Sequence, residues 1–293
     1  MRFLCVFLML LSAPAIAKPV PFDTWLAQFK KDALEKGIKP ETLAAAFAKT
    51  APIDDIIRLD RKQPEGTKTL PEYMETVVSG MRIEEGKRQL ENHKQLLGKI
   101  EKKYGVDKEI IVALWGIETN YGENTGNYPV VDALATLAYD GRRSEFFREE
   151  LVNALKIIDA DHIAADEMIG SWAGAMGQCQ FMPSSFLQFA ADYNEDGRRD
   201  IWHTTEDVFA SIANYLHSEG WQLDGEIAMP VELPKDFDNK LTDIKITKTT
   251  QQWRELGVTY NDGSPLVANA LPASVIMVGR DADAVPYIVY DNY

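Results

Sequence analysis

Residues 110–118 of the chain are Ile-Ile-Val-Ala-Leu-Trp-Gly-Ile-Glu, an apolar run that ends on a single acid. The run follows Asp107, and its composition predicts a helix over 109–118. On one face of that helix, the residues three, four and seven places before Glu118 are all apolar. They are Trp115, Leu114 and Ile111. The carboxyl group of Glu118 is therefore predicted to project from an apolar stripe.

Surroundings of low polarity disfavour the charged form of a carboxyl group and raise its pKa. A general acid has to hold its proton near neutral pH, so the position of Glu118 favours an acid–base role. The alternative is a buried glutamate paired with an arginine, for which Arg142 and Arg143 are the candidates. Periodicity alone favours this alternative, so Glu118 by itself does not decide the function.

Helical spacing of apolar residues continues on both sides of this segment. The further predicted helices cover 22–49, with a second segment that opens at Pro40, and 71–104, 129–139, 144–164, 184–193 and 206–219. Beyond Trp221 two short apolar runs of β type follow, 274–278 and 287–290, bounded by glycine and proline. We therefore predict a mainly α (α+β) protein, with a helical body and a small mixed α/β C-terminal part.

A stretch rich in small residues, 170–185, is the most unusual part of the sequence: Gly-Ser-Trp-Ala-Gly-Ala-Met-Gly-Gln-Cys-Gln-Phe-Met-Pro-Ser-Ser. It fits neither a phosphate-binding loop nor a dinucleotide fingerprint. Small residues let backbone amides approach a ligand, and Ser171, Gln178 and Gln180 offer directional hydrogen bonds. Together with Trp172 and Tyr121 as stacking surfaces, this combination suits a sugar. The alternative is a tight connection between helices that is selected for packing, and packing is the expected role of Cys179.

The first residues have the parts of a secretory signal peptide, namely Arg2, an apolar run over 3–11, and small residues at Ala15 and Ala17. We expect cleavage after Ala17. The apolar run is shorter than the roughly 20 residues that a membrane-spanning helix needs, and we expect no transmembrane segment elsewhere. Removal of the segment leaves Cys179 as the only cysteine, so no internal disulfide is expected in the mature chain.

The net charge of the whole chain is −14, and it becomes −15 once Arg2 is removed with the signal peptide. Proteins that bind nucleic acid carry basic surface stripes, so this balance argues against a nucleic-acid partner. It also provides no long-range attraction to an anionic polymer. Recognition of such a ligand has to come from a local groove.

A possible cation-binding loop begins at Asp192 and follows the pattern D-x-[DN]-x-[DN]-G, with Asn194 and Asp196 as the third and fifth residues. The seventh residue, Arg198, would contribute its backbone carbonyl. The twelfth residue is His203 instead of the usual glutamate, so a standard EF-hand is not formed. We expect a structural cation, Ca²⁺, that fixes the loop and takes no part in chemistry. The alternative is that these side chains cap turns and that Thr204 and Asp207 form a capping box for the next helix.

Four ordered motifs connect the chain with a known family. They are Trp-Gly-Ile-Glu-Thr-Asn-Tyr-Gly at 115–122, Asp-Ala-Leu-Ala-Thr-Leu at 132–137, Ala-Gly-Ala-Met-Gly at 173–177 with Gln-Phe-Met-Pro-Ser-Ser at 180–185, and Ala-Asn-Tyr at 213–215 with Gly-Trp at 220–221. In this order they resemble the lytic murein transglycosylase B family, and the resemblance covers nearly all of the expected mature chain. It implies a lysozyme-like helical catalytic domain that acts on the MurNAc–GlcNAc β-1,4 bond of peptidoglycan.

The resemblance also implies roles for individual residues. Glu118 matches the catalytic glutamate of the family, and Ser171, Gln180 and Tyr215 match positions that line its sugar groove; we add Tyr121 as a further substrate-binding candidate. The family cleaves without water: the muramyl 6-hydroxyl attacks its own anomeric carbon and leaves a 1,6-anhydro end. One carboxyl group can act first as acid and then as base, so no second carboxylate is needed. Glu123 and Asp140 are nevertheless kept as candidates for a second carboxylate.

The expected domain boundaries follow from the resemblance. They are a signal peptide over 1–17, an N-terminal helical region over 18–105, a lysozyme-like catalytic core over 106–225, and a small C-terminal α/β region over 226–293.

The resemblance also bears on the cation loop and on the partners of the protein. Some family members have a lengthened cation loop whose last acid comes later, here Glu206 or Asp207. We expect a periplasmic monomer that binds peptidoglycan glycan strands and needs no cofactor for catalysis.

Two other functions are kept as alternatives. One is a muramidase on the same scaffold that uses water, and the other is a peptidoglycan-binding protein without catalysis. The second gains weight because members of the resembled family usually continue past 289–293 with a segment and a last helix that help to close the groove. We therefore expect an incomplete groove if the chain ends there.

Overall fold

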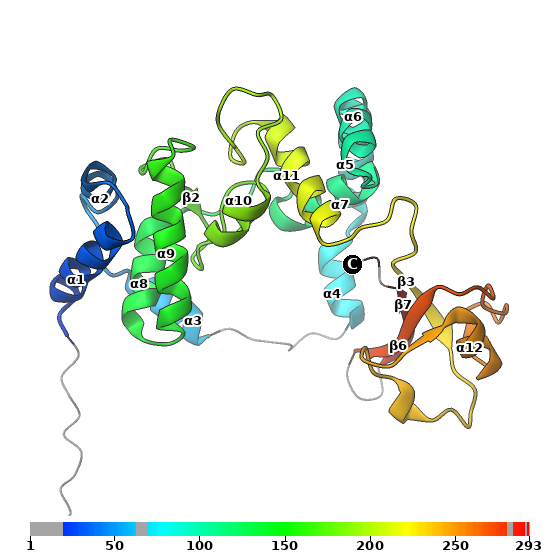
Figure 1. The fold of residues 1–293 in the computed structure, drawn as a ribbon. Helices are drawn as coiled ribbons and strands as arrows, with labels where there is room; N and C mark the ends of the chain where they lie inside the picture. Colours follow the sequence, from blue (N-terminus) through cyan, green and yellow to red (C-terminus); the bar gives the residue numbers. More distant parts are fainter. Residues whose placement is uncertain (1–19, 63–69, 280–283, 291, 293) are drawn as a thin grey trace, which may run out of the picture.

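The computed structural model describes residues 20–62, 70–279, 284–290 and 292 (Figure 1). The predicted signal peptide over 1–17 lies outside these residues. Most of the described chain folds into a helical body, followed by a small five-stranded sheet, so the predicted fold class is confirmed. In the described residues, no helix combines the length and the apolar character that crossing a membrane requires.

The helical body contains eleven helices of the described chain and one short strand pair. The helices are α1 (Phe22–Glu35), α2 (Pro40–Ala46), α3 (Asp54–Arg61), α4 (Leu70–Val77), α5 (Gly80–Asn92), α6 (Lys94–Tyr104), α7 (Lys108–Thr119), α8 (Val130–Asp140), α9 (Ser144–Asp159), α10 (Pro183–Phe189) and α11 (Thr205–Ser218). The strands β1 (Tyr128–Pro129) and β2 (Ile169–Gly170) pair antiparallel.

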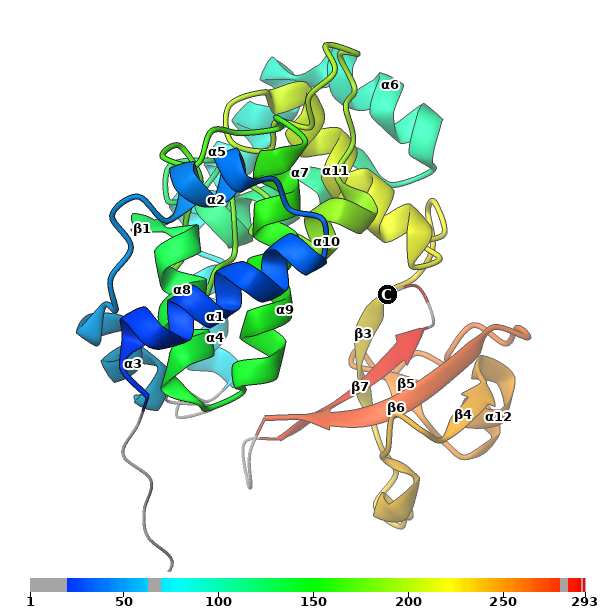
Figure 2. The same ribbon diagram turned by 60° about the vertical axis from the view of Figure 1, so that its left-hand side comes forward.

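One hydrophobic core holds this body together. Fully buried side chains come from helices at both ends of the body, such as Phe29 of α1, Leu97 of α6, Leu134 of α8 and Phe209 of α11. α8 lies at its centre, since eight of its residues are buried, and α9 packs along it (Figure 2). Residues on both sides of the expected boundary at 105/106 therefore contribute to the same core.

The predicted helices are found, with local differences that have identifiable causes. The segment predicted over 71–104 is three helices, because Ser79 caps the start of α5 and a further break occurs at His93. α9 ends at Asp159 instead of 164, since Asp161 adopts a left-handed conformation with φ of 60°. α10 ends at Phe189 because the following residue is extended.

The C-terminal part is an antiparallel sheet with strand order β4-β6-β7-β3-β5. Its elements are β3 (Ala228–Glu232), β4 (Thr247–Thr249), α12 (Thr250–Glu255), β5 (Thr259–Tyr260), β6 (Pro272–Val278) and β7 (Val285–Tyr290), with a short 3-10 helix at Asn239–Leu241. The two predicted β runs lie inside β6 and β7. A separate core around Trp253, Val275 and Ile288 supports this sheet, so its packing is distinct from that of the helical body.

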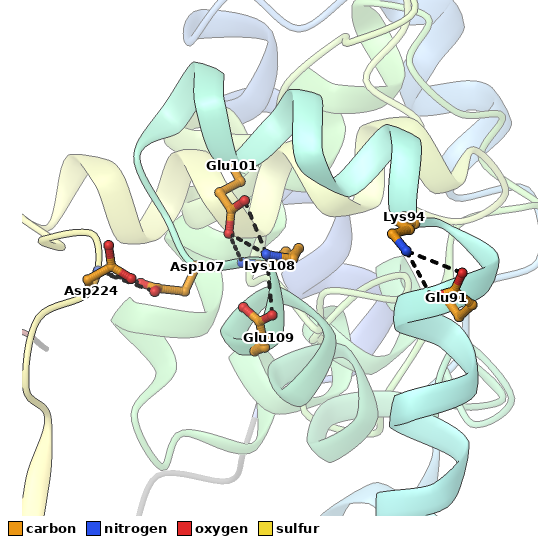
Figure 3. A network of polar contacts seen from close by, with 7 residues as sticks. All are labelled: Glu91, Lys94, Glu101, Asp107, Lys108, Glu109 and Asp224. Carbon is orange, nitrogen blue, oxygen red and sulfur yellow. Dashed lines mark hydrogen bonds and ion pairs between the residues drawn. The ribbon is translucent and has the colours of Figure 1, made fainter.

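Polar contacts at the start of α7 connect the body with the chain that leads to the sheet. The Asp107 carboxylate accepts hydrogen bonds from Trp221 Nε1 at 2.8 Å and from the backbone N of Asp224 at 3.2 Å. On the same corner, Lys108 Nζ lies 3.1 Å from Glu101 and 3.3 Å from Glu109 (Figure 3). These contacts fix the first turn of the helix whose last turn carries Glu118.

Glycines in two adjacent helices provide a test of this packing. A Cβ at Gly116 of α7 would lie 2.6 Å from the ring of Tyr121, whereas a Cβ at Gly98 of α6 would meet nothing within 4 Å. We expect Gly116→Ala to destabilise the fold by about 1–3 kcal/mol through overpacking. The matched Gly98→Ala should be neutral or stabilise by up to about 1 kcal/mol through helix propensity. Urea unfolding of both variants measures the difference, and equal stabilities would contradict the packing of Tyr121 against α7.

Candidate active site

Glu118 is the penultimate residue of α7 and lines a pocket of about 230 Å³. The pocket is formed by Leu114, Glu118, Cys179, Gln180, Phe181, Met182, Ser185, Ile212 and Tyr215. It thus lies between α7, the segment 179–185 and α11. Of the predicted apolar stripe, Leu114 lines the pocket, and Trp115 and Ile111 are buried in the core.

The carboxyl group of Glu118 is accessible from solvent but partly shielded by the pocket walls. Burial raises its pKa above the ordinary value of 4.5, in the direction that the apolar stripe predicts. Among the described residues, Glu118 has no hydrogen-bond or ion-pair partner. The group is therefore reachable by a substrate and is not compensated by a neighbouring cation.

The arginines that could have paired with Glu118 are bound elsewhere. Arg142 and Arg143 both form ion pairs with Asp60, at 3.4 and 3.0 Å, and the Asp60 side chain is only 1% exposed. The alternative of a structural pair between Glu118 and Arg142 or Arg143 is therefore wrong, because a buried carboxylate on α3 holds both guanidinium groups.

Gln180 and Tyr215 share the pocket with Glu118. The side-chain amide of Gln180 donates to the backbone oxygens of Thr125 at 3.1 Å and Gly177 at 2.9 Å. These bonds use its nitrogen and hold its backbone in a left-handed conformation with φ of 49°. The Tyr215 ring packs against Phe189, with ring centres 5.0 Å apart. Both side chains are thus held in place beside the acid.

Ser171 and Tyr121, the other two predicted substrate-binding residues, do not line this pocket. Ser171 Oγ accepts a hydrogen bond from the backbone N of Ala175 at 3.0 Å and closes a turn within the loop. The hydroxyl of Tyr121 donates to the backbone oxygen of Arg82 at 2.7 Å, and its ring lines a neighbouring pocket with Ile117. Their part in binding stays a prediction.

The two candidates for a second carboxylate also lie outside the pocket. Glu123 accepts a hydrogen bond from Asn120 Nδ2 at 2.5 Å, and Asp140 forms an ion pair with Arg61 at 2.8 Å. Glu118 is therefore the one carboxylate among the described residues that line this pocket.

The small residues of the loop serve close packing. A Cβ at Gly170 would lie 2.2 Å from the backbone oxygen of Ala175, and one at Gly177 would lie 2.6 Å from that of Ile201. The Cys179 thiol is buried, and its Sγ lies 3.5 Å from the backbone oxygen of Val208. Burial raises the pKa of this thiol, and its buried position agrees with the packing role that the sequence predicts. The loop is tightly packed and also forms a wall of the pocket, while its part in binding a sugar stays a prediction.

Several pocket residues were not predicted. Met182, Ser185 and Ile212 line it, but only the topology brings α10 and α11 to the end of α7. Of these three residues, only Ile212 could have been predicted from the sequence. It lies three residues before Tyr215 and therefore on the same face of α11. Gln178, expected to offer hydrogen bonds to a ligand, instead binds Trp115 and Trp202 within the protein.

The predicted cation loop has side chains that gather around its own backbone. Asp192 Oδ1 and Asn194 Oδ1 each accept from the backbone N of Asp196 at 3.1 Å, and Asp192 Oδ2 accepts from that of Gly197 at 2.9 Å. Asn194 Nδ2 in turn donates to Asp196 Oδ2 at 3.0 Å. Across the described residues, however, no three His, Cys, Asp or Glu side chains are grouped as a metal site.

Asp207, the proposed last acid, closes the loop from α11. It is completely buried, and its two oxygens accept from the backbone N of Tyr193 at 2.7 Å and of Asp200 at 2.8 Å. Burial raises the pKa of this carboxyl group. Thr204 does not form the alternative capping box, because its hydroxyl donates to Asp200 and no side-chain cap is present. The side chain of Arg198 leaves the loop and binds Asp161 at 3.2 Å.

Comparison with known proteins agrees with this architecture. A family model described as "Transglycosylase SLT domain" matches residues 21–293. Membrane-bound lytic murein transglycosylase B of Escherichia coli K12 is 31% identical over 219 residues, which is 70% of this chain and 60% of that protein. The chain thus spans less than two thirds of the length of this relative.

Solved structures give the same result. SltB3 from Pseudomonas aeruginosa, in complex with NAG-anhNAM-pentapeptide, superimposes with a TM-score of 0.88 at 39% identity, over 92% of this chain and 72% of that one. Slt35 of Escherichia coli, in complex with calcium, gives a TM-score of 0.76 at 28% identity, over 91% of this chain and 84% of that one. The resemblance that the four sequence motifs carry is confirmed, and the chain belongs to the transglycosylase SLT domain family.

Proposed function

We propose that this protein is a lytic transglycosylase that cleaves the MurNAc–GlcNAc β-1,4 bond of peptidoglycan and leaves 1,6-anhydro-muramyl ends. The observation that carries the proposal is the carboxyl group of Glu118, which is the one carboxyl group among the described residues of a pocket that it shares with Gln180 and Tyr215 and which has no ion-pair partner among them. The complex of the relative SltB3 with NAG-anhNAM-pentapeptide supports the same chemistry.

The reaction needs one group that gives a proton and takes one back. Protonated Glu118 donates its proton to the glycosidic oxygen, and the bond between that oxygen and the muramyl anomeric carbon breaks. The 6-hydroxyl of the same muramyl residue then forms a bond to the anomeric carbon, and its proton returns to the Glu118 carboxylate. Atoms and charges balance without water, and the enzyme ends in its starting state.

The surroundings of Glu118 suit this cycle. Its raised pKa increases the protonated fraction available for the first step. Because no cation of the described residues forms an ion pair with the carboxylate, it remains basic enough to accept the proton of the 6-hydroxyl. Gln180, Tyr215 and Ser185 bring polar side chains to the pocket that suit a sugar, while Leu114 and Ile212 bring apolar ones.

Substitution of the acid tests the function. We expect Glu118→Gln to lower cleavage of purified sacculi by at least about a hundredfold, because an amide fills the same space but cannot exchange the proton. Mass spectrometry of the wild-type digest should show anhydro-muropeptides. Reducing ends in their place would indicate a muramidase, and binding to sacculi without release of muropeptides would indicate a non-catalytic protein; either result contradicts the proposal.

The same variant should change stability in a pH-dependent way. Because the pKa of Glu118 in the folded protein is raised above 4.5, ionising this group costs folding free energy. The cost is absent below the unfolded pKa and grows as the pH rises through the folded pKa. We therefore expect Glu118→Gln to melt at a higher temperature than wild type at neutral pH and at the same temperature in acid. Equal melting temperatures across the range would show that the folded pKa is ordinary.

We also propose that the protein acts in the periplasm after export through the predicted signal peptide.

We further propose that the loop binds Ca²⁺. The ligands would be the side chains of Asp192, Asn194, Asp196 and Asp207 and the backbone carbonyl of Arg198. The fit is supported by the convergence of Asp192 and Asn194 on one amide and by the buried Asp207, which has no ion pair among the described residues. A cation there would offset the charge of Asp207. The relative Slt35 forms a complex with calcium. The bound ion would hold the loop and supply no catalytic step.

Thermal unfolding tests the cation. We expect excess Ca²⁺ to raise the melting temperature relative to chelator, since binding at about a hundred times Kd stabilises by about 2.7 kcal/mol. The double variant Asp192→Asn/Asp196→Asn should lose this increase. Asp262→Asn, which alters a similar turn in the C-terminal part, should keep it. No increase in the wild type, or the same increase with the double variant, would contradict the site.

A further inference from the structure

Gln178 directly precedes the segment 179–185 that forms one wall of the Glu118 pocket, and both ends of its side-chain amide form hydrogen bonds within the protein. Oε1 accepts from Trp115 Nε1 at 2.8 Å, and Nε2 donates to the backbone oxygen of Trp202 at 2.8 Å. An indole N–H can only donate and a carbonyl can only accept, so the orientation of the amide is determined by its partners. Both ends of the side chain are thus committed to protein groups.

The backbone of the same residue adds two further bonds. Its oxygen accepts from Thr119 Oγ1 at 3.1 Å, and its N–H donates to the backbone oxygen of Ile201 at 2.8 Å. Gln178 is therefore connected to the last turn of α7 on one side and to the segment 201–202 on the other. Gly122 leaves room for it, because a Cβ there would lie 2.4 Å from Oε1.

Two of these hydrogen bonds go to residues of α7 on either side of Glu118 in the sequence. Trp115 lies three residues before Glu118 on α7, and Thr119 directly follows it. The residues after Gln178, from Cys179 to Met182, form the opposite wall of the pocket. Trp115 is itself only 5% exposed and packs edge-on against Tyr121 and Phe209, so its indole is well placed to hold the helix. Gln178 is therefore the residue at which α7, which carries Glu118, is bonded to the loop that carries Gln180.

We propose that Gln178 is a positioning residue for Glu118: its amide joins the catalytic helix to the loop that faces it and so fixes where the carboxyl group meets the glycosidic oxygen. This inference rests on the proposed function, since it assigns Gln178 a part in that reaction. Glutamine is required because one planar group has to accept from Trp115 and donate to Trp202. A glutamate lacks the donor when ionised, and a methionine of similar size has no donor and only a weak sulfur acceptor.

Kinetics of Gln178→Met test the proposal. Displacement of a catalytic group by about 1 Å can cost about a hundredfold in rate. On soluble glycan strands we expect kcat to fall ten- to a hundredfold, with KM changed by less than threefold, because the residue does not face the substrate. In Gln178→Glu the new carboxyl group can donate a hydrogen bond to Trp202 only when it is protonated. We therefore expect the kcat of this variant, relative to wild type at the same pH, to rise as the pH falls.

Two matched variants separate positioning from general destabilisation. Gln28→Met makes the same substitution on the exposed face of α1. Thr136→Val, in α8 and outside the lining of the pocket, removes a buried hydroxyl that accepts a hydrogen bond from the backbone N of Ile53. We expect both to keep wild-type kcat, even where Thr136→Val lowers the melting temperature as much as Gln178→Met. A loss of kcat in Thr136→Val equal to that in Gln178→Met would overturn the proposal, as would an unchanged kcat in Gln178→Met.

A second measurement does not depend on activity. Hydrogen exchange of the peptide that covers 115–122 should be faster in Gln178→Met than in wild type, and unchanged in Gln28→Met. If wild-type protein releases no anhydro products, the proposed function fails. The exchange experiment then still measures whether the hydrogen bonds of Gln178 stabilise the end of α7. Unchanged exchange in Gln178→Met overturns the positioning role whatever the activity.

Discussion

The charge on Glu118 has no partner in the described part of the chain, and the two arginines that sequence alone offers as partners are held by Asp60. Much of the proposed chemistry depends on this separation. A guanidinium group beside Glu118 would keep the carboxyl group ionised and weaken it as an acid. With Arg142 and Arg143 bound to α3, the pKa of Glu118 is governed by the pocket walls, and the same group can give and take back one proton.

The rest of the body places and holds that carboxyl group. α7 is fixed at its start by the contacts of Asp107, and it packs through Ile111 and Trp115 into the core that α8 dominates. At its end, Gln178 and Thr119 join it to the loop that supplies Gln180. The small residues of that loop serve this arrangement, because side chains at Gly170 or Gly177 would collide with backbone oxygens. The hydrogen bonds around Asp207 tie the ends of the loop 192–200 beside it.

Sequence reasoning found what periodicity and motifs encode. The helix that carries Glu118, the β runs inside β6 and β7, and the sharing of one pocket by Glu118, Gln180 and Tyr215 follow from spacing and resemblance. It missed features that depend on tertiary contacts. The role of Arg143 is decided by a carboxylate more than eighty positions away at Asp60, and the roles of Gln178 and Tyr121 are decided by partners that the topology brings to them. The short strands β3 to β5 carry too few residues to show a period.

A titration of Glu118 tests the central claim most directly. Carboxyl carbon NMR of glutamate-labelled protein, with Glu118→Gln to assign the resonance, gives the pKa of this group in the folded enzyme. The structure predicts a value above the ordinary 4.5, because the pocket disfavours the charged form and no cation among the residues with a described position compensates it. A pKa at or below 4.5 would mean that the carboxylate has an electrostatic partner or full hydration, and would contradict its role as the single acid and base.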